Sequence, residues 1–187
     1  MIEMPDVPIS RAEPVITRDQ RIARSRYGGE SQSIDYGATP AFSLTFVPML
    51  ESQALALEAW LESPDTFMMP PPGYAFPSGL GTARINGAGQ AGTAINTDGW
   101  NGSTTVLTRG QWIQIGNALH RLSADAATNA SGAVTLNLTR PLRTPTVNNQ
   151  VLDYGSPQGL FRIADAERRA SKVPLFTTVT VTVEAVL

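Results

Sequence analysis

Alternating apolar and polar positions predict two long strands, one in the first third of the chain and one at its end. Within residues 39–47 every second residue is a large apolar one, namely Phe42, Leu44 and Phe46. Within residues 177–187 apolar residues again alternate, here with threonines and a glutamate. Each pattern is typical of a strand that buries one face, so we expect both strands in sheets with one covered side.

A helical spacing follows the first of these strands. Four apolar residues are separated by four, three and four positions, which places them on one face of an α-helix with Trp60 at its edge. These residues are Leu50, Ala54, Leu57 and Leu61. Prolines bracket the pattern, and proline does not continue a helix interior. We therefore expect one amphipathic helix over residues 50–62.

The middle of the chain carries short apolar runs separated by turn residues. Five runs are expected as strands: residues 105–107, 112–115, 119–122, 134–138 and 160–163. Gly116 and Asn117 join the second run to the third, and both residue types accept the positive φ angles of a two-residue hairpin turn. This turn fixes the strand register, and the five strands together indicate a small β-barrel.

Residues 15–27 alternate less regularly and are followed by two glycines, so they predict a strand that ends in a turn. Arg18, Arg24 and Arg26 share one face of this strand, and Tyr27 stands next to them. Such a face is either solvated or a contact with an acidic neighbour. These four residues are therefore the candidates for a subunit interface.

The order of these elements predicts two domains. The proline-rich residues 69–79 are too stiff and too poor in backbone donors for regular structure, so they join the helix to the middle strands. The last strand either completes the barrel or returns to the first sheet, and we favour the return, which makes the middle an insertion. The prediction is a mainly β protein: a β-sandwich-like domain with one helix at residues 1–80 and 164–187, and a small barrel at residues 81–163.

Composition and charge narrow the function classes. Of the 187 residues, 42% are hydrophobic and 16% charged, which is typical of a globular protein with a lightly charged surface. The chain has no cysteine, which excludes disulfides and thiolate metal sites. Its net charge of -2 argues against general nucleic-acid binding. No apolar run is long enough to span a bilayer and the first residues lack a signal-peptide pattern, so we expect a cytoplasmic product without membrane insertion.

One motif and one single residue suggest cofactor or metal chemistry, but the residues around them do not complete such a site. Gly87, Gly89 and Gly92 match the GxGxxG spacing of dinucleotide sites. A turn-rich stretch follows them where a helix is needed, and Trp112 stands where the acidic residue belongs, so we expect a flexible loop. His120 is the only histidine, which rules out a histidine cluster, and its place in an alternating strand predicts a structural role.

Residues 96–102 offer oxygen ligands but lack the spaced acids of a calcium loop, so Asp98 with Gly99 predicts a plain turn. Several aspartates stand in predicted loops or at strand ends without forming an acid and base pair: Asp65, Asp98, Asp125, Asp153 and Asp165. We therefore expect no catalytic, cofactor or metal site. Trp100 and Trp112 leave a carbohydrate-binding β module as an alternative, and the aspartates leave a hydrolase as a weaker one.

Two stretches of the chain resemble the distal tail proteins of siphophages. The run RIARSRYGGESQSIDYGATPAFSLTFVP, followed by a helix ending ALEAWLES, is similar to their first domain. The run INTDGWNGSTTVLTRGQWIQIGNALHRLSADAATNASGAVTLNLTRPLR is similar to a second lobe of some members, with a turn, a GDxIQIG-like strand, a hairpin partner and a strand closing in PLR. The resemblance covers the chain from about Val15 onward.

The resemblance implies a structural virion protein and not an enzyme. Distal tail proteins form a six-membered ring that joins the tail tube to the hub and provides attachment for fibres or receptor-binding proteins. The implied partners are copies of the same chain, the tail tube protein, the hub and fibre proteins. The implied location is the virion tail tip, with the host cytoplasm before assembly. Many members finish with a galectin-like domain, whereas this sequence predicts a smaller lobe placed before a final strand, so sugar binding is not carried over.

Overall fold

The computed structural model describes residues 4–5, 7–24, 31–47, 49–62, 66–102, 104–164, 169–173 and 176–186. The chain forms two compact units. The first comprises Met1–Phe67 and Phe161–Ala185, and the second comprises Met68–Leu160 with Val186–Leu187. The proline-rich residues 69–79 therefore lie in the second unit, whereas we expected them in the first. Among the described residues, no helix has the length and apolar character that crossing a membrane requires.

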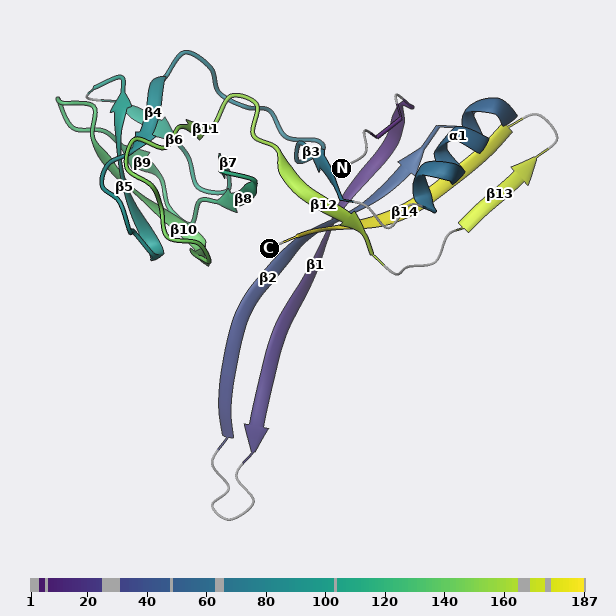
Figure 1. The fold of residues 1–187 in the computed structure, drawn as a ribbon, viewed down its shortest axis with the longest axis horizontal. Coiled ribbons are helices and arrows are strands. Elements are labelled where there is room, and N and C mark those ends of the chain that lie inside the picture. Colours follow the sequence, from purple (N-terminus) through teal and green to yellow (C-terminus); the bar gives the residue numbers. More distant parts are fainter. Residues whose placement is uncertain are drawn as a thin grey trace. The chain divides into compact units, whose positions relative to one another are not determined.

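Strands that are far apart in the sequence form the sheet of the first unit (Figure 1). Their order is β1-β2-β14-β12-β3, and β13 pairs with β14 on the same edge as β12. The bounds are Ile9–Arg24 for β1, Ser31–Phe46 for β2, Phe67–Met69 for β3, Gly159–Ile163 for β12, Arg169–Val173 for β13 and Phe176–Ala185 for β14. The last strand thus returns to the first sheet, as the sequence predicted.

The core of the first unit lies between this sheet and the helix α1 (Glu51–Leu61). The alternating apolar residues of β2 and β14 are buried, as predicted: Phe42, Leu44, Phe46, Val179, Val181 and Val183. The ring of Trp60 on α1 meets the ring of Phe67 edge-on, with centroids 4.7 Å apart. All described strands of this unit belong to one sheet. The helix therefore forms the second layer of this unit. The sandwich-like domain that the sequence predicted would have a second sheet in that place.

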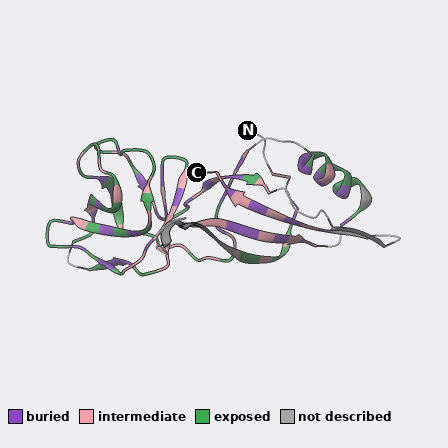
Figure 2. Cartoon of the chain, turned by 90° about the horizontal axis from the view of Figure 1, so that it is seen from below, coloured by how far each residue is buried: buried purple, intermediate pink, exposed green. Residues whose placement is uncertain are grey.

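The helix α1 confirms the helix predicted over residues 50–62, with a change to its buried face. Ala54, Leu57 and Leu61 are buried as expected, and Trp60 is buried with them instead of lying at the edge. Buried and exposed segments alternate along this helix in Figure 2. Leu50 is 60% exposed. It stands before the first turn with the extended backbone of an N-cap, at φ -65° and ψ 152°, so its side chain does not continue the helical face.

Three small sheets form the second unit, in the orders β10-β5-β4, β11-β7-β8 and β6-β9. The bounds are Gly81–Ile85 for β4, Gly92–Trp100 for β5, Thr105–Leu107 for β6, Trp112–Ile115 for β7, Ala118–Arg121 for β8, Ala126–Ala127 for β9, Val134–Leu142 for β10 and Leu152–Asp153 for β11. Single bridges, Arg84↔Val151 and Leu122↔Leu138, link the two three-stranded sheets at both sides. The strands of these two sheets therefore close into a circuit, and buried residues of β6 and β9 belong to the same core. This arrangement corresponds to the small barrel that the sequence predicted.

Four of the five predicted middle strands lie in this barrel, as β6, β7, β8 and β10. The fifth was assigned to the barrel wrongly, because β12 pairs with β14 in the sheet of the first unit. The ring of Phe161 on β12 explains this placement, since it lies 5.9 Å from the ring of Phe42. Strands β4 and β5 were not among the expected strands. Their buried residues include Ile85 and Ile95, which are completely enclosed in the barrel core.

Gly116 and Asn117 form the predicted two-residue turn, since Ile115 pairs directly with Ala118. Gly116 has a φ of 63°, whereas Asn117 does not have a positive φ. A positive φ at the first turn position alone is the pattern of a type II′ turn, which favours glycine there. The turn was predicted correctly, but it depends on the backbone freedom of the glycine and not on that of the asparagine.

Candidate subunit interface

The first unit contains a long hairpin formed by β1 and β2, which pair antiparallel along their lengths (Figure 1). β14 pairs only with residues 41–45 of β2. Beyond that segment, residues 16–24 and 31–40 pair only with each other within the described chain. We call this part the hairpin arm. At about 3.4 Å per residue, it extends roughly 30 Å.

Both edges of the hairpin arm are unpaired within the described residues. An antiparallel strand directs its backbone N–H and C=O groups alternately to the two sides. About half of these groups in the arm therefore face away from the partner strand. Open strand edges readily pair with another chain, and an isolated two-stranded hairpin is marginally stable in water. The arm thus has the properties of an element that another molecule covers.

The root of the arm shows how the sequence ends the wider sheet. Pro40 comes immediately before the segment of β2 that pairs with β14, and proline has no N–H to give to a ladder. On the other strand, Ser10 Oγ donates a hydrogen bond to the backbone oxygen of Thr45 at 2.8 Å. Arg11 and Glu13 form an exposed ion pair at 2.5 Å, which contributes little to stability. Hydrophobic burial in the sheet, and not charge, therefore anchors the arm.

Two of the four predicted interface residues lie on the arm. Arg18 pairs in register with Ala38, and Arg24 pairs with Ser31. Arg26 and Tyr27 lie outside the described residues, as does the turn that was predicted after them. The pairing shifts register just after Arg18, which interrupts the alternation on which the shared arginine face was predicted. The first half of β2 was not predicted from the sequence, although a strand as long as β1 pairs along its length only with an equally long partner.

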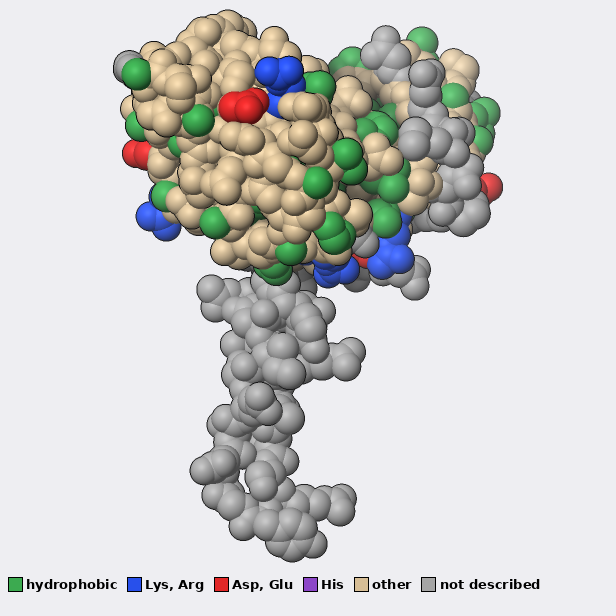
Figure 3. Space-filling model, turned by 60° about the vertical axis from the view of Figure 1, so that its left-hand side comes forward, with side chains coloured by type: hydrophobic (Ala, Val, Ile, Leu, Met, Phe, Trp, Pro, Cys, Tyr) green, Lys and Arg blue, Asp and Glu red, His purple; other side chains and the backbone are tan. Residues whose placement is uncertain are grey.

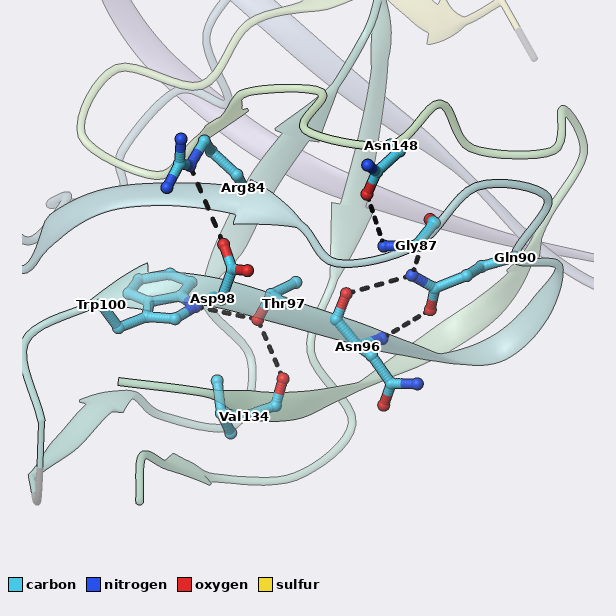
Figure 4. A network of polar contacts seen from close by, with 9 residues as sticks. All are labelled: Arg84, Gly87, Gln90, Asn96, Thr97, Asp98, Trp100, Val134 and Asn148. Carbon is cyan, nitrogen blue, oxygen red and sulfur yellow. Dashed lines mark hydrogen bonds and ion pairs between the residues drawn. The ribbon is translucent and has the colours of Figure 1, made fainter. Parts of the chain in front are cut away.

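Gly87 (Figure 4) and Gly89 lie in the short loop between β4 and β5, where we expected a loop, and Gly92 is the first residue of β5. Gln90 holds this connection, because its Nε2 donates to the backbone oxygen of Gly87 at 3.1 Å and its Oε1 accepts from the N–H of Asn96 at 2.6 Å. All three glycines have positive φ. A strand and not a helix follows them, so the geometry that binds a pyrophosphate is missing.

Asp98 and Gly99 lie within β5, so the plain turn predicted for them is wrong. Asp98 Oδ1 is 3.8 Å from Arg84 Nε on the adjacent strand (Figure 4). Gly99 has a φ of 79°, and a Cβ at this position would overlap the backbone oxygen of Thr82. The glycine therefore allows the close approach of β4 and β5, and the carboxylate of Asp98 lies within ion-pair distance of Arg84 without a hydrogen bond to its Oδ1.

Trp100 and Trp112 are core residues, with 4% and 6% of their surfaces exposed. Trp100 Nε1 donates to Thr97 Oγ1 at 2.8 Å, and its ring lies 5.1 Å from that of Tyr154. The guanidinium carbon of Arg121 lies 5.6 Å from the ring centre of Trp112. Neither indole presents an open face on which a sugar could stack. The carbohydrate-binding alternative therefore loses the residues on which it depended.

The described aspartates of the second unit take part in local structure. Asp125 Oδ1 accepts from the backbone N–H of Arg109 at 2.7 Å, and Asp153 Oδ1 accepts from two N–H groups of the turn that follows it, at 3.0 and 2.9 Å. Asp65 and Asp165 lie outside the described residues. Within the described chain, no group of three histidine or acidic side chains is close enough together to hold a metal ion.

His120 lies half-buried on β8. Burial, and then the positive charge of Arg140, lower the pKa of His120 to about 4. The imidazole is therefore neutral at pH 7, with one N–H donor and one acceptor nitrogen. It has no histidine or acidic partner with which it could act in a triad, because no such side chain is hydrogen-bonded to it among the described residues.

Charged side chains are few on the face that Figure 3 draws, where uncharged side chains and backbone make up most of the described surface. The unpaired strand edges of the hairpin arm are therefore the strongest feature for binding another molecule in the first unit. In comparisons with known proteins, no protein-family model and no curated protein matches the chain.

Proposed function

We propose that this protein is a structural subunit of a phage tail tip, and that copies of it form a ring that joins the tail tube to the hub. The observation that carries the proposal is the hairpin arm, whose edges are unpaired over residues 16–24 and 31–40 in the described chain. The tail-tip setting comes from the sequence resemblance to siphophage distal tail proteins. Fibres or receptor-binding proteins would attach to the same ring.

A neighbouring copy is the partner that fits the arm best. The arm reaches roughly 30 Å beyond the strands that share its sheet, which is far enough to contact a second subunit. When the arm of one subunit contacts the body of the next, the contact is head-to-tail, and such contacts close into a ring if the rotation between subunits allows it. Each subunit then covers the open edge of another.

Shortening the arm tests this proposal. In one variant Asn-Gly replaces residues 17–39, so that Ile16 and Pro40, which already pair in register, flank a two-residue turn. Residues 41–46 and α1 are unchanged, so we expect the fluorescence of Trp60 and the thermal unfolding of the rest of the chain to persist. Light scattering after size exclusion, over a range of concentrations, should show an oligomer for the wild-type chain and a monomer for the shortened one.

A second variant tests whether the strands of the arm or the residues that connect them make the contact between subunits. It keeps both strands and replaces residues 25–30, which include Arg26 and Tyr27, with Gly and Ser residues. Loss of the oligomer in this variant would assign the contact to those residues, and its retention would assign the contact to the strands. Electron microscopy of the wild-type oligomer should show a closed ring. A wild-type chain that stays monomeric at high concentration would contradict the proposal.

A further inference from the structure

The second unit contains a cavity of about 440 Å³ that has no role in the proposed contact between subunits. The β7–β8 hairpin forms one wall, from Ile115 to His120, and the end of β10 with the residues after it forms another, from Arg140 to Pro145. Gln150, Leu160 and Val186 complete the lining. Its volume lies in the range of cavities that hold small ligands.

The polar lining of this cavity is positively charged. Arg140 and Arg143 both line it, and no aspartate or glutamate is among its described lining residues. His120 lines it as well. The bridge between Leu122 and Leu138 aligns β8 with β10, and two residues farther along these antiparallel strands His120 comes opposite Arg140. The structure therefore brings an imidazole and two guanidinium groups to one cavity.

Arg140 lacks an acceptor at one of its donors. Its Nε is buried, and no described residue accepts a hydrogen bond from it. Burial, and then the nearby charge of Arg143, lower the pKa of Arg140, which indicates that the described surroundings do not compensate its charge. A buried donor without a partner destabilises a protein, so such a group in a cavity indicates a site for an acceptor from outside.

The rest of the lining is apolar. Leu119, Leu142 and Leu160 face the cavity together with Pro141 and Pro145. A bare inorganic anion would leave this apolar surface in water, whereas an acid with an aliphatic body would cover it. A guanidinium binds a carboxylate through two parallel N–H donors, which gives the acid a defined orientation.

We propose that this cavity binds a carboxylate carried on an aliphatic group, with Arg140 and Arg143 holding the acid and the leucines covering its body. The neutral ring of His120 adds one N–H donor beside the two arginines. Such a carboxylate comes either from a free aliphatic acid or from an acidic side chain of another protein. This site is independent of the hairpin arm, because all of its lining residues belong to the second unit.

The single histidine of the chain makes the test direct, because one imidazole signal in an NMR spectrum reports on the cavity. Hexanoate is added to the full chain at pH 7, and hexanamide serves as the uncharged probe of the same shape. We expect hexanoate to shift the His120 signal to saturation and to raise its titration midpoint above pH 4, since an anion favours the imidazolium. An equal response to hexanamide, or no saturable response to hexanoate, would overturn the proposal.

Arginine variants locate the binding group. Arg140→Gln should weaken hexanoate binding at least tenfold, while Arg109→Gln should leave it unchanged, because Arg109 is exposed in the same unit and does not line the cavity. Undiminished binding by a folded Arg140→Gln chain would refute the assignment. If Arg140→Gln does not fold, the comparison of hexanoate with hexanamide on the wild-type chain still shows whether the cavity selects a carboxylate.

Two peptides distinguish the sources of the carboxylate. They are acetyl-Leu-Glu-Leu-amide, which carries an acidic side chain between leucines, and its Gln counterpart. Tighter binding of the Glu peptide than of hexanoate would assign the site to a protein partner, and the reverse order would assign it to a free acid. Equal binding of the Glu and Gln peptides, together with equal binding of hexanoate and hexanamide, would show that the cavity does not select a carboxylate.

Discussion

Acidification should destabilise the second unit through His120. The pKa of this histidine is lowered to about 4 in the folded chain by burial and by Arg140, whereas the unfolded chain has the ordinary value of 6.5. Between these two values the unfolded state binds a proton that the folded state does not, so lowering the pH favours unfolding. The full contribution is present above pH 6.5, decreases as the pH falls, and is lost near pH 4.

The size of the effect follows from the difference between the two pKa values. Each unit of that difference corresponds to about 1.36 kcal/mol, so the free energy of unfolding should fall by about 3 kcal/mol across this range. This loss is a large fraction of the stability of a small domain, which is typically about 5–15 kcal/mol. Acid unfolding of the second unit should therefore begin at a higher pH than carboxylate titration alone would cause.

Urea unfolding between pH 8 and pH 4 measures this loss, with tryptophan fluorescence as the signal. The chain has three tryptophans, and Trp60→Phe leaves only Trp100 and Trp112, both in the second unit. His120→Gln in the same background is the control, because it retains every carboxylate and removes the titrating imidazole. The difference between the two pH profiles isolates His120. Parallel profiles from pH 6.5 to pH 4 would refute the reasoning.

Two glycine substitutions in the barrel, each compared with a control substitution, test its backbone in the same assay. Gly116→Val should destabilise the second unit by about 1–3 kcal/mol, because valine is strained at a φ of 63°, whereas Asn117→Ala at the next position should cost less than about 0.5 kcal/mol. A loss of the first unit together with the second would show that the two do not unfold separately. Gly99→Ala should cost roughly 3 kcal/mol or more, because its Cβ would overlap the backbone oxygen of Thr82. Gly73→Ala has a similar φ of 78° with nothing within 4 Å, so it should cost only the backbone strain of about 1 kcal/mol, and equal losses for the two alanine variants would contradict the overlap argument.

Local patterns predicted those elements whose burial is one-sided and regular. The alternation of Phe42, Leu44 and Phe46 corresponds to buried positions of β2, and the spacing of Leu57 and Leu61 corresponds to the buried side of α1. Both cases depend on residues close in the sequence. The final strand was predicted for the same reason, and its return to the first sheet followed from the way in which domains are usually inserted.

Strand β5 shows why other elements were not predictable. Its sequence, GTAINTDGW, is polar and rich in turn residues, yet Thr97 is 1% exposed in the barrel core. The hydroxyl of Thr97 donates to the backbone oxygen of Val134 at 2.9 Å and accepts from Trp100 (Figure 4). These two hydrogen bonds compensate for burying the threonine hydroxyl. A pattern of apolar residues along the sequence does not reveal such partners.

The candidate sites were predictable only in part. Arg18 and Arg24 were identified on a strand, but the length of the arm emerges only from the pairing of β1 with β2. The cavity was missed altogether, although Arg143 is the last residue of the PLR motif at the end of β10 and Arg140 immediately precedes that motif. Their meeting with His120 depends on the single bridge between β8 and β10. A sequence pattern within one segment does not report such a bridge.

The place of β14 in the sheet determines the order in which the chain folds as it leaves the ribosome. β14 lies between β2 and β12, so the sheet of the first unit is incomplete until the last of its strands has been synthesised. The barrel strands, β4 to β11, all precede β14 in the sequence, and the contacts between them are therefore available earlier. β1 and β2 are synthesised first, and their neighbour in the sheet, β14, is synthesised last. The barrel can therefore form before the sheet that supports the arm is complete.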